Sequence, residues 1–234
     1  MEKNNRKPAT KKAKTSGPLA KAYLIFYNFA QTIGWSYLMY QVIDYYMDSD
    51  VNKVSLYEKV KWTVIFFQNA ALLEVVHAVI GIVSSSPMIT IQQVASRVIV
   101  VCGVLMATEL PRKSIGFPLL LFAWSITEII RYSNYALNLM NSVPHFLVWL
   151  RYSTFIILYP IGVTGELLCL YSAQQEVGDT GLWTISMPNT YNVIFNYRYF
   201  LIAVMSLYIP LFPQMYLHMV SQRKKVLGKA KKMN

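Results

Sequence analysis

Charged residues are scarce in this chain of 234 residues, since only 14% are Asp, Glu, Lys or Arg while 55% are hydrophobic. Soluble domains carry about a quarter charged residues, so the composition excludes an ordinary water-soluble globule. The positive mean hydropathy of +0.35 agrees with that exclusion. The composition therefore predicts a membrane protein.

Acidic residues are the rarer of the two charge types, with 11 Asp and Glu against 22 Lys and Arg. The first 21 residues carry a net charge of +6, the last 12 carry another +6, and the body between them carries −1. Basic ends can bind nucleic acid, but the body has no recognisable nucleic-acid-binding motif. Beside an apolar body they indicate the cytosolic side of a membrane. We expect 1–18 to be a disordered basic cytosolic tail and 221–234 to be a second basic cytosolic tail.

Cysteine and histidine are rare as well. The two cysteines, Cys102 and Cys169, lie in apolar stretches, where buried thiols are expected rather than a disulfide. Three histidines are too few for a His-rich membrane oxygenase. No Ser-His or Cys-His arrangement, P-loop or Gly-rich dinucleotide turn is visible. The sequence thus argues against acyl transfer and nucleotide binding through these motifs, and it suggests no metal or organic cofactor.

Long apolar stretches are abundant. An even number of spans puts both ends on one side of the membrane, and with those ends cytosolic the cytosolic segments hold 16 Lys and Arg against six on the other side, as the positive-inside rule requires. We predict an all-α polytopic membrane protein in which residues 19–220 form a six-transmembrane-helix bundle with short loops. Six stretches approach the length that crosses about 30 Å of hydrocarbon: Leu19–Ile43, Trp62–Val83, Val94–Leu110, Ile115–Tyr135, Phe146–Tyr171 and Tyr199–Val220.

Three arginines of the body lie near the predicted cytosolic mouth. Arg97 starts the third span, Arg131 ends the fourth and Arg151 starts the fifth. A guanidinium group binds phosphate through its forked donors, but each arginine could instead anchor a helix end by extending to the headgroups. Because three of them cluster, we favour a site for an anionic ligand.

The second span contains an acidic residue and a histidine one turn apart. Glu74 and His77 form Glu-x-x-His, which is one half of a di-iron site in helical bundles. A complete site needs a second such pair, and Glu128 with Arg131 lacks the imidazole, so we expect no metal here. Glu74 and His77 are instead expected to join a buried polar network or to line a cavity with Gln93.

The fourth span carries its own pair of opposite charges. Glu128 and Arg131 are one helical turn apart, and mutual pairing is the simplest expectation. Trp124, Tyr132 and Tyr135 beside them fit an aromatic belt at the membrane interface.

Glu166 differs from these acidic residues because no basic residue lies within a turn of it. A carboxylate at the centre of a bilayer costs about 2.5–3.5 kcal/mol and is a functional-site candidate by default. Tyr159 precedes it by seven residues, so the two side chains share one helix face, roughly 10 Å apart along the axis. Pro160 is expected to bend or open the helix, and Gly162 and Gly165 allow close approach of backbone or ligand.

Two interpretations of this segment stay open: a kinked helix with a hydrogen-bonded glutamate, or a cavity that holds an acid/base pair. A carboxylate in a low-dielectric cavity is a competent base near neutral pH, and a tyrosine hydroxyl is a weak acid. Together they fit removal of a proton next to a carbonyl, coupled to loss of a β-hydroxyl group.

Ordered motifs over residues 19–225 carry a family resemblance. The most telling segment contains Leu-Arg-Tyr at 150–152, Leu-Tyr-Pro-x-Gly at 158–162 and Glu166. The other motifs are Tyr27-Asn28 with Gly34-Trp35, Leu73-Glu74-Val75-x-His77, Gln93 with Ser96-Arg97, Trp124-Ser125-x-x-Glu128 with Arg131-Tyr132, and Tyr216-x-His218-Met219. Together they resemble the very-long-chain (3R)-3-hydroxyacyl-CoA dehydratases, which are also called protein tyrosine phosphatase-like or PASTICCINO2-like proteins.

The resemblance implies a lyase that converts (3R)-3-hydroxyacyl-CoA to trans-2-enoyl-CoA, the third step of microsomal fatty-acid elongation, without a cofactor. It assigns catalysis to Tyr159 and Glu166. We favour Glu166 as the base and Tyr159 as the acid, although Tyr159 could instead polarise the thioester. The residues expected to bind the CoA phosphates or to line the cavity are Arg97, Arg131, Arg151, Gln93, Glu74 and Gly162.

The resemblance also implies a multi-pass protein of the endoplasmic reticulum membrane with both termini cytosolic. Its expected partners are the condensing enzyme and the ketoacyl and enoyl reductases of elongation. Lys231 and Lys232 fit a dilysine retrieval signal, whereas neither cysteine has the arginine six residues later that a tyrosine phosphatase would need. The alternative function is a catalytically inactive scaffold or acyl-chain-binding partner of the elongase.

Overall fold

A computed structural model describes residues 17–50 and 53–230 of the chain. The predictions for residues 1–16, including most of the basic N-terminal tail, lie outside the described residues. So does the dilysine sequence near the C-terminus. The segment from residue 221 begins inside a helix that continues to Ala230, and its cytosolic placement stays a prediction.

The described residues are helical, apart from connecting segments and one isolated antiparallel bridge between Ile185 and Phe195. The predicted all-α class is therefore confirmed. In chain order the elements are α1 (Pro18–Met47), α2 (Leu56–Ala70), α3 (Leu72–Ile80), α4 (Pro87–Val98), the π-helix η1 (Ile99–Leu105), α5 (Leu110–Lys113), α6 (Gly116–Leu139), α7 (His145–Arg151), α8 (Phe155–Thr180) and α9 (Tyr197–Ala230).

Local sequence signals explain several helix ends. The hydroxyl of Ser55 accepts a hydrogen bond from the backbone N–H of Glu58, which starts α2 with a Ser-x-x-Glu pattern. Pro87 occupies the first turn of α4, where its missing N–H costs nothing. At the C-terminal end of α8, Gly181 adopts the left-handed conformation with a φ of 67°, which terminates the helix.

Among the residues that the structure describes, four helical segments are long and apolar enough to cross a membrane. They are Leu56–Ile80, Pro87–Leu105, Phe155–Thr180 and Tyr197–Val226. Helices α1 and α6 are also long, but polar side chains that are buried in the bundle, such as Gln31 and Glu128, interrupt their apolar sequences. The structure thus supports a helical membrane protein, and the count of six spans stays a prediction.

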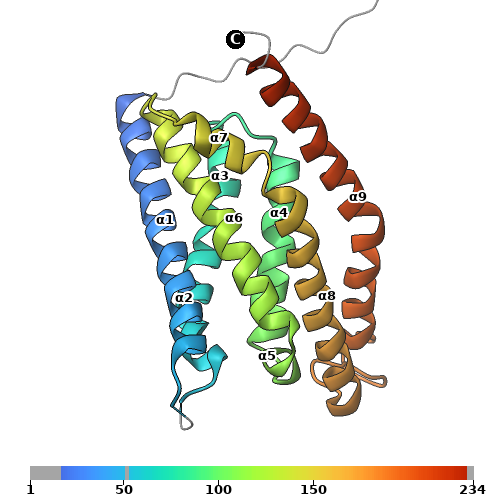
Figure 1. Ribbon diagram of the computed structural model, residues 1–234. Helices are drawn as coiled ribbons and strands as arrows, with labels where there is room; N and C mark the ends of the chain where they lie inside the picture. The colour runs from blue at the N-terminus through green and yellow to red at the C-terminus, as the bar shows by residue number, and fades with distance from the viewer. Residues whose placement is uncertain (1–16, 51–52, 231–234) are drawn as a thin grey trace, which may run out of the picture.

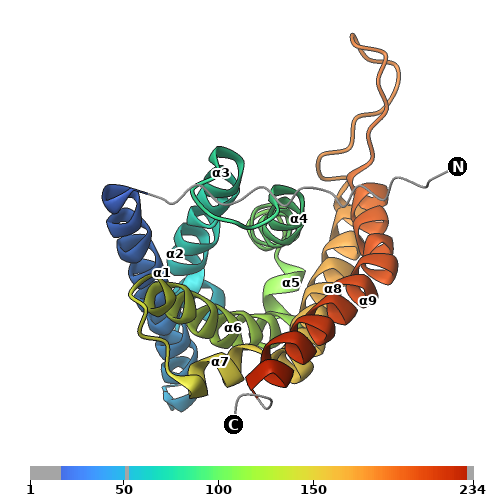
Figure 2. The ribbon, with the colours of Figure 1, turned by 90° about the horizontal axis from the view of Figure 1, so that it is seen from above.

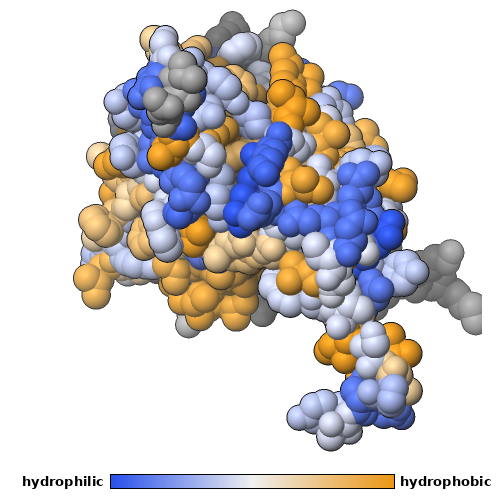
Figure 3. All heavy atoms as spheres, turned by 90° about the horizontal axis from the view of Figure 1, so that it is seen from below, coloured by the Kyte–Doolittle hydropathy of each residue, from blue (hydrophilic) through white to orange (hydrophobic). Residues whose placement is uncertain are grey.

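The long helices form a bundle in which α6 lies between α1 and α8, and α9 packs along the outer side of α8 (Figures 1 and 2). The start of α1 and the end of α9 lie at the same end of the bundle (Figure 1). At the opposite end, hydrophilic side chains gather across the middle of the face and hydrophobic ones toward its rim (Figure 3). This distribution fits a bundle whose sides contact lipid while its ends contact water.

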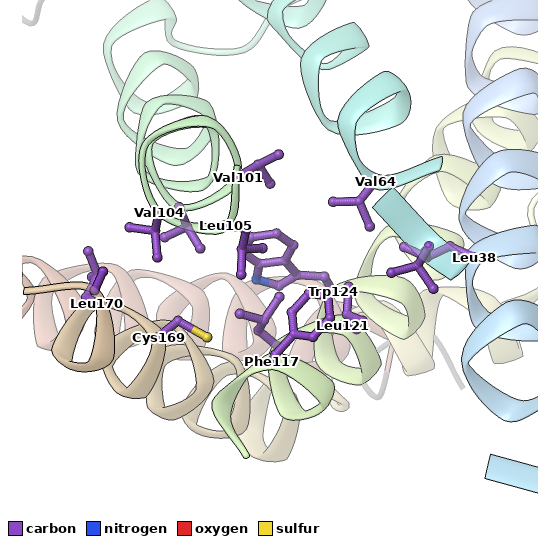
Figure 4. Close-up of a cluster of buried hydrophobic side chains, with 14 of the residues drawn as sticks. Leu38, Val64, Val101, Val104, Leu105, Phe117, Leu121, Trp124, Cys169 and Leu170 are labelled. Carbon is purple, nitrogen blue, oxygen red and sulfur yellow. The ribbon is translucent and has the colours of Figure 1, made fainter. Parts of the chain in front are cut away.

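The core is built around α6. Trp124 is 2% exposed and packs among side chains from η1, α2 and α8, including Val101, Leu105 and Val64 (Figure 4). Helices α6 and α8 approach so closely that a Cβ added to Gly165 would stand 2.7 Å from the backbone nitrogen of Leu120. The expected close approach at Gly165 is confirmed, and it brings the residue that follows, Glu166, against α6.

Two local predictions were wrong. Arg97 does not start a span, because α4 begins at Pro87 and Arg97 lies in its last turn, just before η1. The third span was predicted to start at Val94, but the residues from Pro87 onward already belong to the helix. Helix α8 also runs from Phe155 to Thr180 without opening at Pro160, so that part of the prediction is wrong, while a bend at Pro160 stays a prediction. The helical path is instead interrupted at 152–154, between α7 and α8.

Candidate active site

A cavity of about 490 Å³ lies among α4, α6, α8 and α9. Its lining includes Tyr159 and Glu166, so the prediction that they share one face of a helix is confirmed. Of the eight residues expected at the site, seven line this cavity: Gln93, Arg97, Arg131, Arg151, Tyr159, Gly162 and Glu166. Glu74 is not part of the lining and contacts the cavity through Arg131, to which it is bonded.

Glu166 is 7% exposed, and its carboxylate is held by donors from two other helices. Nε1–H of Trp124 on α6 donates to its Oε1 across 2.8 Å. The hydroxyl of Tyr208 on α9 donates to its Oε2 across 2.7 Å. Each oxygen therefore has one fixed donor and keeps lone-pair capacity for a further proton.

The sequence alone did not predict that Trp124 and Tyr208 bond Glu166. Trp124 had been assigned to an interfacial belt, as had Tyr132, but both are buried in the core at 2% and 1% exposure. The aromatic-belt interpretation of these two residues is therefore wrong. Tyr208 stands 42 residues beyond Glu166 on the last helix, and no local spacing signals that contact.

Tyr159 is fixed in position by aromatic packing, but its hydroxyl has only a weak partner. Its ring stacks on Phe212 with centroids 5.5 Å apart and an interplanar angle of 14°. The hydroxyl donates to Sδ of Met215 at 3.5 Å, and a thioether sulfur is a weak acceptor. A substrate oxygen could replace that contact with a net gain in hydrogen bonding.

A series of connected ion pairs on α3, α4 and α6 borders another side of the cavity. Arg131 donates to Glu128 and also, through both terminal nitrogens, to Glu74 at 2.6 and 2.8 Å. Glu128 pairs as well with Arg97, and Tyr132 donates to Glu74. The predicted Glu128–Arg131 pair is confirmed, and the polar network expected around Glu74 joins α3, α4 and α6.

Arg151 is different from the other two arginines. Its Nη1 donates to the amide oxygen of Asn134 at 2.6 Å, and its guanidinium lies 4.5 Å from the ring centroid of Tyr135. In the part of the chain that the structure describes, no carboxylate pairs with it. Arg97 and Arg131 are neutralised within the network, so of the three arginines that line the cavity Arg151 is the one best able to attract an external anion.

His77, Gln93 and Gly162, which the sequence also singled out, make few specific contacts. His77 is buried and shares a hydrogen bond of 3.0 Å with the hydroxyl of Tyr23. Gln93 lines the cavity from an exposed position on α4. At Gly162 an added Cβ would meet Ala123 at 3.4 Å, which is ordinary contact, so a close approach there is not required by packing.

The fold and this site define a class: a helical membrane protein whose internal cavity combines a positioned carboxylate, a weakly bonded phenol and an uncompensated guanidinium. A family model described as protein tyrosine phosphatase-like protein, PTPLA, matches residues 68–229. The chain belongs to this family.

Curated relatives extend the likeness over most of the chain. Very-long-chain (3R)-3-hydroxyacyl-CoA dehydratase 1 of Mus musculus is 45% identical over 226 residues, which cover 97% of this chain and 80% of that protein. Dehydratase hpo-8 of Caenorhabditis elegans is 44% identical over 89% of this chain and 95% of its own length. Dehydratase PASTICCINO 2B of Oryza sativa is 36% identical over 90% and 95%. No solved structure matches the chain.

Proposed function

We propose that this protein is a lyase that removes water from very-long-chain (3R)-3-hydroxyacyl-CoA and releases trans-2-enoyl-CoA, the third step of fatty-acid elongation. The names of its relatives support the reaction. The observation that carries it is the cavity that joins the phenol of Tyr159 and the carboxylate of Glu166 on one wall of α8. General acid–base catalysis requires an acid and a base positioned on the same substrate, and these two side chains line one cavity.

In the proposed mechanism Glu166 removes the proton from C2 of the substrate. The C2–H electron pair forms the C2=C3 double bond, and the C3–O bond breaks as Tyr159 gives its proton to the departing hydroxyl, which leaves as water. The released water then accepts the acquired proton from Glu166 and gives a proton to the Tyr159 phenolate, which restores both groups. Trp124 and Tyr208 orient the carboxylate throughout, because each bonds one of its oxygens.

The substrate's CoA phosphates are proposed to bind at Arg151, whose charge no carboxylate compensates among residues 17–50 and 53–230. The thioester arm then enters the cavity beside Gln93 and Arg131. Because a phosphate accepts the forked donors of a guanidinium well, this placement fixes the end of the substrate that is distant from the reacting carbons.

We further propose six spans with both termini cytosolic in the endoplasmic reticulum membrane, where the elongation condensing enzyme and reductases are the expected partners. The start of α1 and the end of α9 lie at one end of the bundle (Figure 1). The distribution of Lys and Arg supports that end as the cytosolic one.

The test measures enoyl-CoA formed from a long-chain (3R)-3-hydroxyacyl-CoA by detergent-solubilised wild type, Tyr159→Phe and Glu166→Gln. Matched controls are Tyr171→Phe, an exposed tyrosine of α8, and Glu58→Gln, an exposed glutamate of α2. We expect both site variants to lose at least about a hundredfold in kcat and both controls to retain activity. Site variants that match the wild type would contradict the mechanism, and an inert wild type would favour the non-catalytic scaffold.

A further inference from the structure

The outer side of the cavity is bordered by two apolar stripes on different helices. One stripe consists of Ile91 and Ala95 on α4 and Ile99 at the start of η1, which all line the cavity and are spaced four residues apart. Residues at this spacing lie along one side of a helix. The facing stripe lies on α9 and consists of Val204, Leu207, Leu211 and Met215.

The two striped helices do not close against each other. Within residues 17–50 and 53–230, α9 packs along α8 and has no extensive backbone contact with α4 (Figure 2). Near the end of the bundle where α9 begins, the hydroxyl of Tyr197 donates to the carbonyl of Gly103 across 2.8 Å, which connects α9 to η1, the π-helix that continues α4. The gap therefore has a closed end at this hydrogen bond.

The cavity reaches the molecular surface through this gap. Ile91 and Leu207 both line the cavity, yet they are 43% and 54% exposed. Both helices belong to the segments that are long and apolar enough to cross a membrane. An opening between them, bordered by aliphatic side chains, faces the hydrocarbon of the bilayer rather than water.

The cavity is also too small to enclose the proposed substrate. Its volume of about 490 Å³ lies within the range of roughly 300–1,000 Å³ that suits a drug-sized ligand. A very-long-chain acyl group together with the pantetheine arm of CoA is larger than such a ligand. Part of the substrate must therefore lie outside the cavity, and the apolar opening suits only its hydrocarbon part.

We propose that the gap between α4 and α9 is an acyl outlet, through which the saturated hydrocarbon chain of the substrate leaves the cavity and continues into the bilayer. This inference rests on the proposed dehydratase function. The thioester and C3 hydroxyl stay beside Tyr159 and Glu166, while the chain passes between the two stripes. The protein then has no closed pocket that measures chain length, and long chains are accepted because the bilayer holds their ends.

The test narrows the outlet from each wall in turn. Leu207→Trp adds bulk on α9, Ala95→Phe adds bulk on α4, and Ile209→Trp is the matched control, because Ile209 is 76% exposed and lies outside the cavity lining. The measured quantity is the ratio of kcat/KM for 3-hydroxyoctadecanoyl-CoA to that for 3-hydroxyhexanoyl-CoA, in protein reconstituted into nanodiscs. We expect the ratio to fall about tenfold or more in both outlet variants and to stay at the wild-type value in the control.

The possible results distinguish a failure of the acyl outlet from a failure of the proposed dehydratase function. A wild type that converts neither substrate refutes the proposed function, whereas a wild type that converts both, with an unchanged ratio in Leu207→Trp and Ala95→Phe, refutes only the outlet. Wild-type protein gives a second readout through a long-chain 3-hydroxyacyl-CoA with a photoreactive group at its methyl end. Cross-links to the α4 and α9 stripes support the outlet, and cross-links confined to α1 or α2 overturn it.

Discussion

The hydroxyl of Tyr208 donates a hydrogen bond of 2.7 Å to Glu166, which connects the last helix of the chain to the carboxylate on α8. Trp124 on α6 bonds the other oxygen of the same carboxylate. The orientation of the proposed base thus depends on three helices, and it depends on side chains that stand far from it in the sequence. A group held in this way needs little rearrangement at the moment of reaction.

Tyr208→Phe is expected to lower kcat about tenfold to a hundredfold with little change in KM, since a hydrogen bond to a charged group contributes about 1.5–3 kcal/mol. The substitution removes one oxygen atom and leaves the ring. Tyr199→Phe, an exposed tyrosine of the same helix, is the control. Steady-state kinetics on the long-chain substrate distinguish the cases, and an increase in KM alone would assign Tyr208 to substrate binding instead.

A comparison with Trp35 distinguishes the contribution of Trp124 to core packing from its contribution to catalysis. Both indoles are almost fully buried, but Nε1 of Trp35 has no hydrogen-bond partner among the described residues while that of Trp124 bonds Glu166. Trp124→Phe and Trp35→Phe should therefore lose similar thermal stability, and Trp124→Phe alone should lose roughly tenfold or more in kcat. Equal activity losses in the two variants would reduce the role of Trp124 to core packing.

Local periodicity accounts for what the sequence predicted well. Tyr159 and Glu166 share a face because seven residues make almost two turns, and Glu128 pairs with Arg131 because they are one turn apart. Such relationships lie within one helix and need no knowledge of its neighbours.

Contacts between side chains of different helices could not be predicted from the periodicity of single helices. The bond from Tyr208 to Glu166, and the pairing of Arg97 with Glu128 on another helix, depend on how each helix is rotated in the bundle. Single-sequence periodicity leaves that rotation open when apolar residues surround the helix, as they do on α8 and α9. Buried polar side chains such as Trp124 were misplaced for the same reason.

Gly165 is expected to be intolerant of a methyl group. A Cβ there would stand 2.7 Å from the backbone nitrogen of Leu120 and 2.8 Å from the carbonyl oxygen of Gly116. Because α6 and α8 would have to separate, Gly165→Ala should destabilise the protein by about 1–3 kcal/mol, measured by unfolding in detergent. Gly162→Ala is the contrast, since its nearest atom lies at 3.4 Å, and equal destabilisation by both would contradict the close approach.

Arg131→Met is expected to cost about 3 kcal/mol of stability, because it leaves the mostly buried carboxylate of Glu74 without its bidentate partner. Adding Glu74→Gln should then restore part of the loss, since the uncompensated charge is removed as well. Chemical unfolding of the two single variants and the double variant measures the coupling. Additive losses would indicate that the two side chains contribute to stability independently.

Arg151→Gln should raise KM for a 3-hydroxyacyl-CoA about tenfold, because the side chain would no longer present a charged donor to phosphate. The same variant should leave KM unchanged for the corresponding N-acetylcysteamine thioester, which has no phosphates. Arg198→Gln is the control, because Arg198 lies near the start of α9, at the other end of the bundle, and bonds Gln174 at 3.1 Å. A KM that rises equally for both thioesters would show that Arg151 supports the shape of the cavity instead of binding the CoA phosphates.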